Sequence, residues 1–377
     1  MVRKQKLSIE RLQELAVTIR DPRRQTHGNI RHLLVDILVM SLLAVVCGCE
    51  NWEEIRDYAL VKGTWLKTFL ALPHGIPSLS TFERVFRMIQ PEEMERVYRE
   101  WVRPYVGSCL HKQICIDGKT VCGVGRQEEI KLHVVSAWIR EDGISFGQTK
   151  TSEKSNEITA IPELLNTLDI EGGVVTIDAI GCQKKIAQTI RGKEAHYVLA
   201  VKGNQETLLT EVREYFEWAL YDPTERYVLD EYHSSDYEHG RIAHWRVVTT
   251  EETIWFESKH EWKDLKTFVM VERIRKVDGK ETGENAFFIS SLQANAKDFY
   301  ELIRGHWGIE NSLHWVLDVQ FREDACMIHK GNAPENLSLL RKFAMTLLKR
   351  VKSSHVSYRR LQKKAGWDNH FVLQIIA

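Results

Sequence analysis

The sequence lacks a cysteine framework. Its seven cysteines are an odd number, they are scattered between Cys47 and Cys326, and no two of them form a C-x-x-C pair. Neither a disulfide scaffold nor a zinc knuckle fits this spacing. A reducing cytoplasm is the simplest setting for such a chain.

Long hydrophobic runs are also missing. The longest apolar stretch, Ile37–Cys49, has 13 residues. It is too short to span a bilayer and therefore predicts a buried helix. The N-terminus has basic residues but no apolar region before its first acidic residues, which argues against a secretory signal. We expect a soluble cytoplasmic protein with no membrane contact.

Net charge is absent as well, because 52 Lys and Arg balance 52 Asp and Glu. Residues 1–31 contain eight Arg and Lys against three acids, and residues 340–377 contain nine against one. Residues 205–285 are acidic, with eleven basic against nineteen acidic residues. Two basic ends favour contact with a polyanion, most simply nucleic acid, although a solvated charged surface has the same composition.

The pattern along the chain predicts several regions. Residues 1–107 show helical periodicity. Residues 108–204 contain short β-rich runs and helices in the order β-β-β-α-β-α-β, which predicts a mixed sheet covered by helices. The acidic segment 205–285 is too long for a loop, so we expect an inserted β-rich subdomain there. Residues 286–349 should complete the core, and residues 350–377 should form a basic C-terminal tail.

Three carboxylates stand out by their positions. Asp117 interrupts an apolar strand, Asp178 ends a continuous apolar strand, and Glu310 lies on a helix after the acidic segment. Each aspartate alone could be a strand-end cap or the partner of a lysine. Adjacent parallel strands would bring both together, and two such charges about 4 Å apart repel by roughly 4 kcal/mol. Mg²⁺ would remove this repulsion, since it binds a few carboxylates together with water and phosphate.

Glu310 lies in the stretch RGHWGIENSLHWVLDVQF, residues 304–321. His306 and His314 are each four residues away, so the three side chains should form one stripe of a helix. A half-buried helix with interfacial histidines has the same pattern. One zinc ion does not fit, because the stripe would span two turns, about 12 Å. The two tryptophans of the stretch are expected to pack on the sheet rather than stack on a base.

Seven short motifs occur in order along the chain. They are DGK (117–119), IDAIGCQ (177–183), VKGNQ (201–205), HGR (239–241), ISSL (289–292), HWGIENSLHWVLDV (306–319) and NLSLLRKFAMTLLK (336–349). On these motifs the chain, from about residue 20 to 350, resembles the DDE transposases of bacterial insertion sequences. Within that family it resembles the H-repeat-associated group found with Rhs elements.

The resemblance implies an α/β fold, a ribonuclease H-like mixed sheet flanked by helices, with a DNA-binding helical N-terminal domain. It implies two Mg²⁺ or Mn²⁺ ions, with Asp117, Asp178 and Glu310 as catalytic residues and metal ligands. The activity implied is that of a transposase, which binds element ends, cleaves DNA and transfers the 3′-OH to target DNA. The implied setting is a homodimer on double-stranded DNA, at the nucleoid in a bacterial cytoplasm.

One part of the family pattern is missing. Related transposases carry a Tyr-x2-Arg-x3-Glu-x6-Lys signature, but the positions other than the glutamate are Ile303, His306 and Leu317 here. Other polar side chains must then supply the DNA contacts, although any one of them could be an ordinary surface residue. The candidates are Lys119, Lys202, Arg304, His306 and Asn311.

Two other functions remain open. The first is a metal-dependent nuclease that uses the same fold without strand transfer, since a fold does not by itself define a function. The second is a catalytically silent DNA-binding relic, against which the intact Asp, Asp and Glu set argues. An assay of DNA joining separates the first alternative from a transposase.

Overall fold

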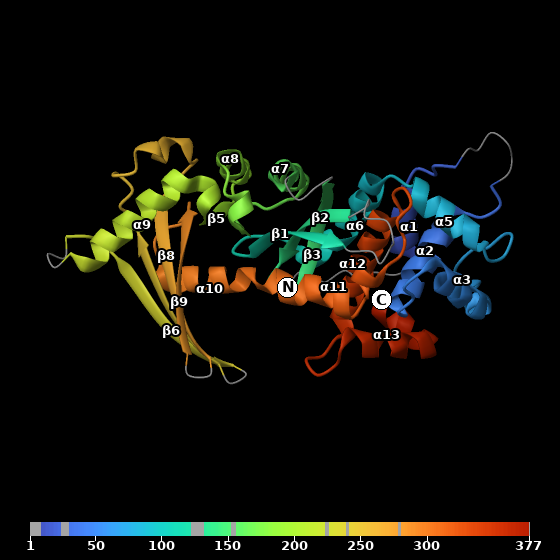
Figure 1. Ribbon diagram of the computed structural model, residues 1–377. Coiled ribbons are helices and arrows are strands. Elements are labelled where there is room, and N and C mark those ends of the chain that lie inside the picture. Colours follow the sequence, from blue (N-terminus) through green and yellow to red (C-terminus); the bar gives the residue numbers. More distant parts are fainter. Residues whose placement is uncertain are drawn as a thin grey trace.

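The computed structural model describes residues 9–23, 30–121, 132–151, 156–222, 226–238, 241–277 and 280–376 (Figure 1). Part of the basic segment 1–31 and residues 239 and 240 of the HGR motif lie outside these ranges. The described chain has a helical half, at the right of Figure 1, and a strand-rich half, at the left. One sheet of nine strands runs through the strand-rich half into the middle of the molecule.

The N-terminal region is helical, as its periodicity predicts. It contains α1 (Ile9–Val17), α2 (Leu34–Val46), α3 (Trp52–Val61), α4 (Gly63–Leu66), α5 (Leu79–Met88) and α6 (Pro91–Val106). Helix α2 is apolar on all sides and almost wholly buried, because the long helix α12 (Ala333–Val351) packs against it. Helix α6 starts at Pro91, whose missing N–H has no partner to lose in a first turn. None of the described helices has the length and apolar content of a membrane span.

The core of the sheet is built from the first five strands. These are β1 (Gln113–Val121), β2 (Leu132–Ile139), β3 (Ile144–Thr151), β4 (Val174–Ile177) and β5 (His196–Val201). They lie in the order β3-β2-β1-β4-β5, and only β2 runs against the others. This is the strand arrangement of a ribonuclease H-like core, so the predicted α/β fold class is confirmed. The helices α7 (Glu157–Thr167) and α8 (Lys184–Gly192) lie together beside this sheet (Figure 1).

The acidic segment is rich in strands, as its sequence predicts. It contains α9 (Glu206–Tyr221) and the strands β6 (Asp230–Glu238), β7 (Arg241–Thr250) and β8 (Thr267–Val277), and it ends within β9 (Lys280–Ser290). The expected hairpin is present as β6 and β7. However, β9 pairs with β5, from Val198↔Ser290 to Val201↔Phe287, so all four strands extend the core sheet. The pairing satisfies backbone groups of β5 that would otherwise form an open edge.

The C-terminal segment, which the sequence predicts to be a basic tail, is helical. It forms α13 (Tyr358–Trp367) and α14 (Asn369–Ile376), and both helices contact α12. Their apolar side chains, among them Leu361, Phe371 and Ile375, are buried in the main core. Charge alone suggested a solvated tail, but the apolar residues between the basic ones give these helices a face to bury.

Candidate active site

The two aspartates of the predicted site lie at neighbouring strand ends. Strands β1 and β4 are parallel, and their last paired residues are Ile116 and Ile177. Asp117 and Asp178 follow directly and therefore emerge at the same edge of the pair. Asp178 also caps the short 3-10 helix Ala179–Gly181, where its Oδ1 accepts a hydrogen bond of 3.2 Å from the backbone N–H of Ile180.

The glutamate lies on a helix that is not regular. Helix α10 (Ala296–His306) leads into a π-helical turn at Glu310–His314, and α11 (Trp315–Val319) continues from it. The prediction that His306, Glu310 and His314 form one stripe of a regular helix is wrong. A π-helical turn holds one more residue than an α-helical turn, so side chains four residues apart no longer lie directly above one another. His314 is buried with its Nδ1 3.3 Å from Asp117 Oδ2, whereas Glu310 is exposed.

Two glycines allow the elements around the site to approach closely. A Cβ on Gly305 would lie 2.3 Å from Oε1 of Gln113, so this glycine lets α10 lie against β1. A Cβ on Gly118 would lie 2.4 Å from Oε1 of Glu157, which binds His133 at 2.6 Å. Larger residues would push the helix and the His133–Glu157 pair away from the strand that carries Asp117.

The three acids line one cavity of about 570 Å³. Asp117 and Asp178 contribute from the sheet, and Glu310 contributes from the helix. His306 lies among them, with its Nδ1 3.0 Å from Thr176 Oγ1 on β4. The structure therefore brings together the residues that the resemblance assigned to catalysis.

The acids of the cavity affect one another's protonation. Burial raises the pKa of Asp178, and the nearby charge of Asp117 raises it further. Burial and Asp117 also raise the pKa of Glu310. Burial opposes ionisation of Asp117, but the hydrogen bond and charge of His314 hold the pKa of Asp117 below its ordinary value. Burial lowers the pKa of His306, which favours its neutral form.

The donor chemistry of the cavity fits magnesium. Carboxylate oxygens are the ligands that Mg²⁺ and Mn²⁺ prefer, and a bound cation would relieve the repulsion that raises two of the pKa values. Within the described ranges, no group of three or more His, Cys, Asp or Glu side chains is arranged so that it could hold a metal ion. Mg²⁺ does not require a full cage of protein ligands, because it usually retains water and binds substrate phosphate.

The predicted DNA contacts have different positions. Lys202 and His306 both line the cavity, and Lys202 is exposed whereas His306 is half-buried. Arg304 forms an ion pair with Asp236 and lies over the ring of Trp245. Asn311 is exposed, and its Nδ2 donates to the backbone oxygen of Trp307 at 3.2 Å.

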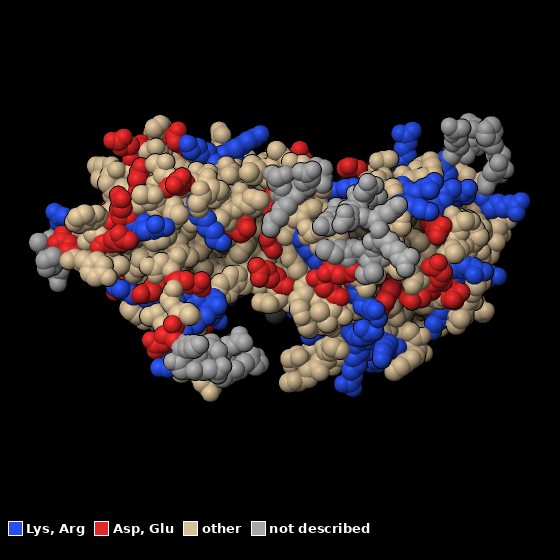
Figure 2. Space-filling model, viewed as in Figure 1, with Lys and Arg blue, Asp and Glu red and all other residues tan. Residues whose placement is uncertain are grey.

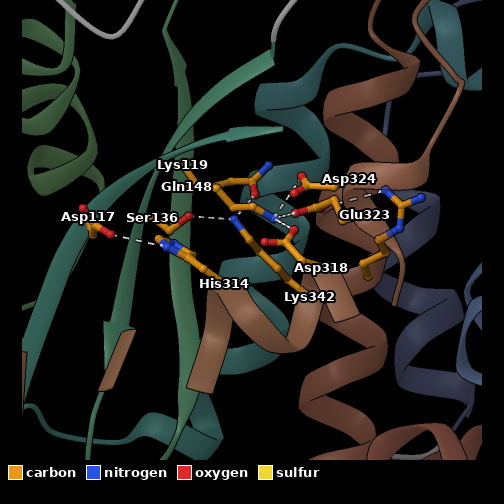
Figure 3. A network of polar contacts seen from close by, with 10 residues as sticks. Asp117, Lys119, Ser136, Gln148, His314, Asp318, Glu323, Asp324 and Lys342 are labelled. Atoms are coloured by element: carbon orange, nitrogen blue, oxygen red, sulfur yellow. Dashed lines mark hydrogen bonds and ion pairs between the residues drawn. The ribbon is translucent and has the colours of Figure 1, made fainter. Parts of the chain in front are cut away.

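Lys119 lies inside the protein and not on a DNA-binding surface. Its side chain is only 11% exposed, and its Nζ is 2.8 Å from Glu323 Oε2 and also pairs with Asp318 (Figure 3). Asp324 is a third partner at 3.8 Å. The positive charge of Lys119 is thus matched by acids of this chain, which argues against the expected phosphate contact.

Lys119 belongs to a buried cluster, the internal ion network, that also contains Lys342 of α12. Lys342 donates to Ser136 Oγ at 2.8 Å and to the side-chain oxygen of Gln148 (Figure 3). Burial raises the cost of ionising Glu323, but Lys119 and Arg341 hold its pKa down at about 2. The internal ion network ties β1, β2 and β3 to the segment after α11 and to α12.

Some residues of the cavity were missed from the sequence. Arg213 on α9, Trp245 on β7 and Arg273 on β8 also line it. They come from the acidic segment 205–285, which gave no motif around these positions. These residues reach the cavity because β9 pairs with β5, which places the preceding strands beside Asp117 and Asp178. The periodicity of the sequence does not reveal this long-range pairing.

Family models match most of the chain. Residues 110–347 match the model described as "Transposase DDE domain", and residues 13–102 match one described as "DDE_Tnp_1-associated". The first match includes all three acids of the cavity and covers more than half of the chain. The chain therefore belongs to the family of DDE-domain transposases.

Full-length relatives support the same group. The chain is 37% identical to YncI of Escherichia coli O157:H7, a protein with a transposase name, over 98% of this chain and 95% of that one. It is also 37% identical to YhhI of E. coli K12, which is named as an H repeat-associated transposase, over 94% of both chains. The sequence-based resemblance to the H-repeat-associated group is thereby confirmed.

One solved structure, a piggyBac transposase synaptic complex with hairpin DNA, aligns with this chain. The alignment covers 99% of this chain and 78% of the piggyBac chain. Its sequence identity of 9% and TM-score of 0.39 are too low to bear on the site or its function.

Proposed function

We propose that this protein is a transposase that binds the ends of its DNA element, cleaves phosphodiester bonds there and joins the freed 3′-OH to target DNA. The observation that carries the proposal is the meeting of Asp117, Asp178 and Glu310 in one cavity of a DDE-family chain. When two Mg²⁺ or Mn²⁺ ions are bound, the chemistry they supply is activation of the attacking oxygen and stabilisation of the leaving oxygen.

The residues of this chain would prepare the site for that reaction. Asp117 and Asp178 would hold ions from the sheet, and Glu310 would hold one from the helix. His314 contacts Asp117 at 3.3 Å and keeps that carboxylate ionised and oriented. His306 is fixed through Thr176 and, being neutral, can exchange a hydrogen bond with a phosphate oxygen or water.

The partner would be double-stranded DNA, bound by a homodimer at the nucleoid in the cytoplasm. On the face shown in Figure 2, Lys and Arg side chains form their largest groups over the helical half, whereas Lys, Arg, Asp and Glu alternate over the strand-rich half. A basic helical surface fits phosphate contacts of an N-terminal DNA-binding region. Beside the cavity, Lys202, His306, Arg304 and Asn311 remain proposed DNA contacts, with Arg304 also held by Asp236.

The test is an assay with oligonucleotides that carry the ends of the surrounding DNA element. Cleavage that requires Mg²⁺ or Mn²⁺, followed by joining of the 3′-OH to a second duplex, supports the transposase. Cleavage without joining would instead identify a nuclease, and binding without cleavage would identify a silent relic. Substitution Glu310→Gln is the matched control, because it removes one carboxylate charge and keeps the side-chain shape.

A further inference from the structure

A guanidinium lies between two indole rings in the wall of the catalytic cavity. The Cζ atom of Arg273 is 4.5 Å from the ring centroid of Trp245 and 4.7 Å from that of Trp307. Trp245 and Arg273 are paired directly across β7 and β8, whereas Trp307 follows α10. A sheet and a helix thus fix the guanidinium from two sides, and a flat cation stacks well on such rings.

The hydrogen-bonding capacity of Arg273 is largely unused. Its Nε is buried and, in the part of the chain that the structure describes, has no hydrogen-bond partner. Its Nη1 is 3.5 Å from Glu284 Oε1, but the Glu284 side chain is 63% exposed, whereas that of Arg273 is 16% exposed. An exposed ion pair of this length contributes little. A buried N–H such as this Nε is costly unless a hydrogen-bond acceptor completes it, and the oxygen of an anion would do so.

Arg273 shares the cavity with the three acids. Lys202 at the end of β5 and Arg213 on α9 line the same cavity. We propose that Arg273, together with Arg213 and Lys202, binds a backbone phosphate of the DNA strand that the acids act on. A guanidinium presents a planar fork of donors to two phosphate oxygens, which a lysine cannot do. This inference rests on the proposed function, and it names the residues that position its substrate.

The same geometry assigns the tryptophans a supporting role. Arg273 covers Trp245 and Trp307, and the Cζ of Arg304 lies 5.1 Å from the Trp245 centroid. A DNA base that stacked on the ring faces that Arg273 covers would have to displace its guanidinium. The rings therefore hold Arg273 in place, and the contact to DNA is made by its charge.

The chain offers a matched control for Arg273. Arg275 lies two residues further on the same strand, and its Nη2 is also 3.5 Å from Glu284 Oε1. Arg275 is not among the residues that line the cavity. Substitution of either arginine removes one positive charge from β8 and one contact to Glu284, but only Arg273 would remove a contact to DNA.

The experiment measures binding of a labelled duplex that carries the element ends, with EDTA present, over a series of KCl concentrations. Arg273→Ala should make the slope of log K against log salt shallower by about one, the contribution of one phosphate contact. Arg275→Ala should keep the wild-type slope. Arg273→Lys should recover the slope with weaker binding, because it keeps the charge and loses the fork. Arg273→Gln serves if the alanine variant fails to fold by circular dichroism.

The possible results distinguish failure of the Arg273 phosphate contact from failure of the proposed transposase function. Equal slopes for the Arg273→Ala and Arg275→Ala proteins would overturn the phosphate contact while leaving the transposase intact. Weaker binding of Trp307→Leu at every salt concentration, with an unchanged slope for Arg273→Ala, would favour base stacking and also overturn it. Wild-type protein that does not bind the duplex would overturn the proposed function together with this inference.

Discussion

Two groups of charges meet on strand β1, only two residues apart. Asp117 belongs to the open cavity, where burial and the charge of Asp117 raise the pKa of Asp178 and of Glu310, and where His314 Nδ1 lies 3.3 Å from Asp117 Oδ2. Lys119 belongs to the internal ion network, where each acid has a cation from this chain. One strand therefore carries an unbalanced cluster and a balanced one.

The difference separates a group of acids that raise one another's pKa from a group of acids that are paired with cations of the same chain. Repelling carboxylates at the edge of a sheet are unfavourable for folding alone, and such groups concentrate at functional sites. A balanced buried network contributes modestly to stability, but removal of one member leaves a charge without its partner. Substitutions in the two clusters should therefore affect different properties: activity in the cavity, and stability in the network.

The largest effect is expected for Asp178→Asn in the cavity. The variant keeps the side-chain shape and an oxygen for the cap of Ile180, but it loses the charge that would hold a metal ion. Cleavage of element-end DNA in Mg²⁺ should fall to background, whereas DNA binding in EDTA and the melting temperature should be retained or improved. Asp298→Asn, an exposed acid of α10, is the control. Wild-type cleavage by the Asp178→Asn protein would exclude Asp178 as a ligand.

The opposite pattern is expected for Glu323→Ala in the internal ion network. The substitution leaves Lys119 and Arg341 without their shared buried partner and should lower the free energy of unfolding by about 3–5 kcal/mol. Asp324→Ala, at 45% exposure and 3.8 Å from the same lysine, should cost less than about 1 kcal/mol. Urea unfolding of both variants measures the difference. An equal decrease in the free energy of unfolding for both variants would show that burial does not make Glu323 more important for stability than Asp324.

The sequence was sufficient to identify the acids of the cavity. Asp117 and Asp178 stand at apolar strands and Glu310 stands on a helix after the acidic segment, and the family motifs then assigned all three to one site on a ribonuclease H-like fold. The site of Lys119 could not be predicted in this way. Its neighbours Asp318 and Glu323 are about 200 residues away in the chain, and a DGK motif looks the same whether its lysine is exposed or buried.

The net charge of a segment also could not predict where its individual charged residues lie, for a similar reason. Net charge counts residues in a segment, but the fold decides which face carries them. The acidic segment 205–285 joins the core sheet and brings Arg213 and Arg273 into the cavity. Arg359, Arg360, Lys363 and Lys364 lie on α13, whose apolar side is buried. In both regions the long-range pairing, and not the composition, decides what each charge does.

A smaller effect concerns Glu335 of α12, a buried acid that feels the charge of Lys342, and it is measured as a dependence of stability on pH. Burial raises the pKa of Glu335 to about 7. The folded state therefore binds this proton more tightly than the unfolded state, so its stabilisation is complete below pH 4.5 and is lost as the pH rises through about 7. Glu335→Gln should accordingly be more stable than wild type by about 1–3 kcal/mol at pH 8, at about 1.4 kcal/mol per pKa unit. The advantage should vanish below pH 4.5, where Glu335 is protonated in both the folded and the unfolded state.

Thermal unfolding of wild type and variant at several pH values measures this dependence. Glu163→Gln, at an exposed position of α7, is the control and should leave the stability difference near zero throughout. A Glu335→Gln protein that is less stable than wild type at pH 8 would mean that the carboxylate has a partner which compensates for its burial.

The smallest effect concerns the basic surface of the helical half. Arg359, Arg360 and Lys363 are exposed on α13, so they can be replaced by glutamine without opening the core. Deletion of residues 350–377 would be uninformative, because it removes the buried side chains of α13 and α14.

With about six phosphates neutralised, wild type should show a slope of log K against log salt near −5. If all three residues contact phosphates, the triple variant should be shallower by about two to three, with unchanged metal dependence of cleavage. Glutamine at Lys259, Lys263 and Lys297, which are exposed on the strand-rich half, should keep the slope. The same loss in both triple variants would show that binding responds to net charge, and no loss in either would make the surface of α13 merely solvated.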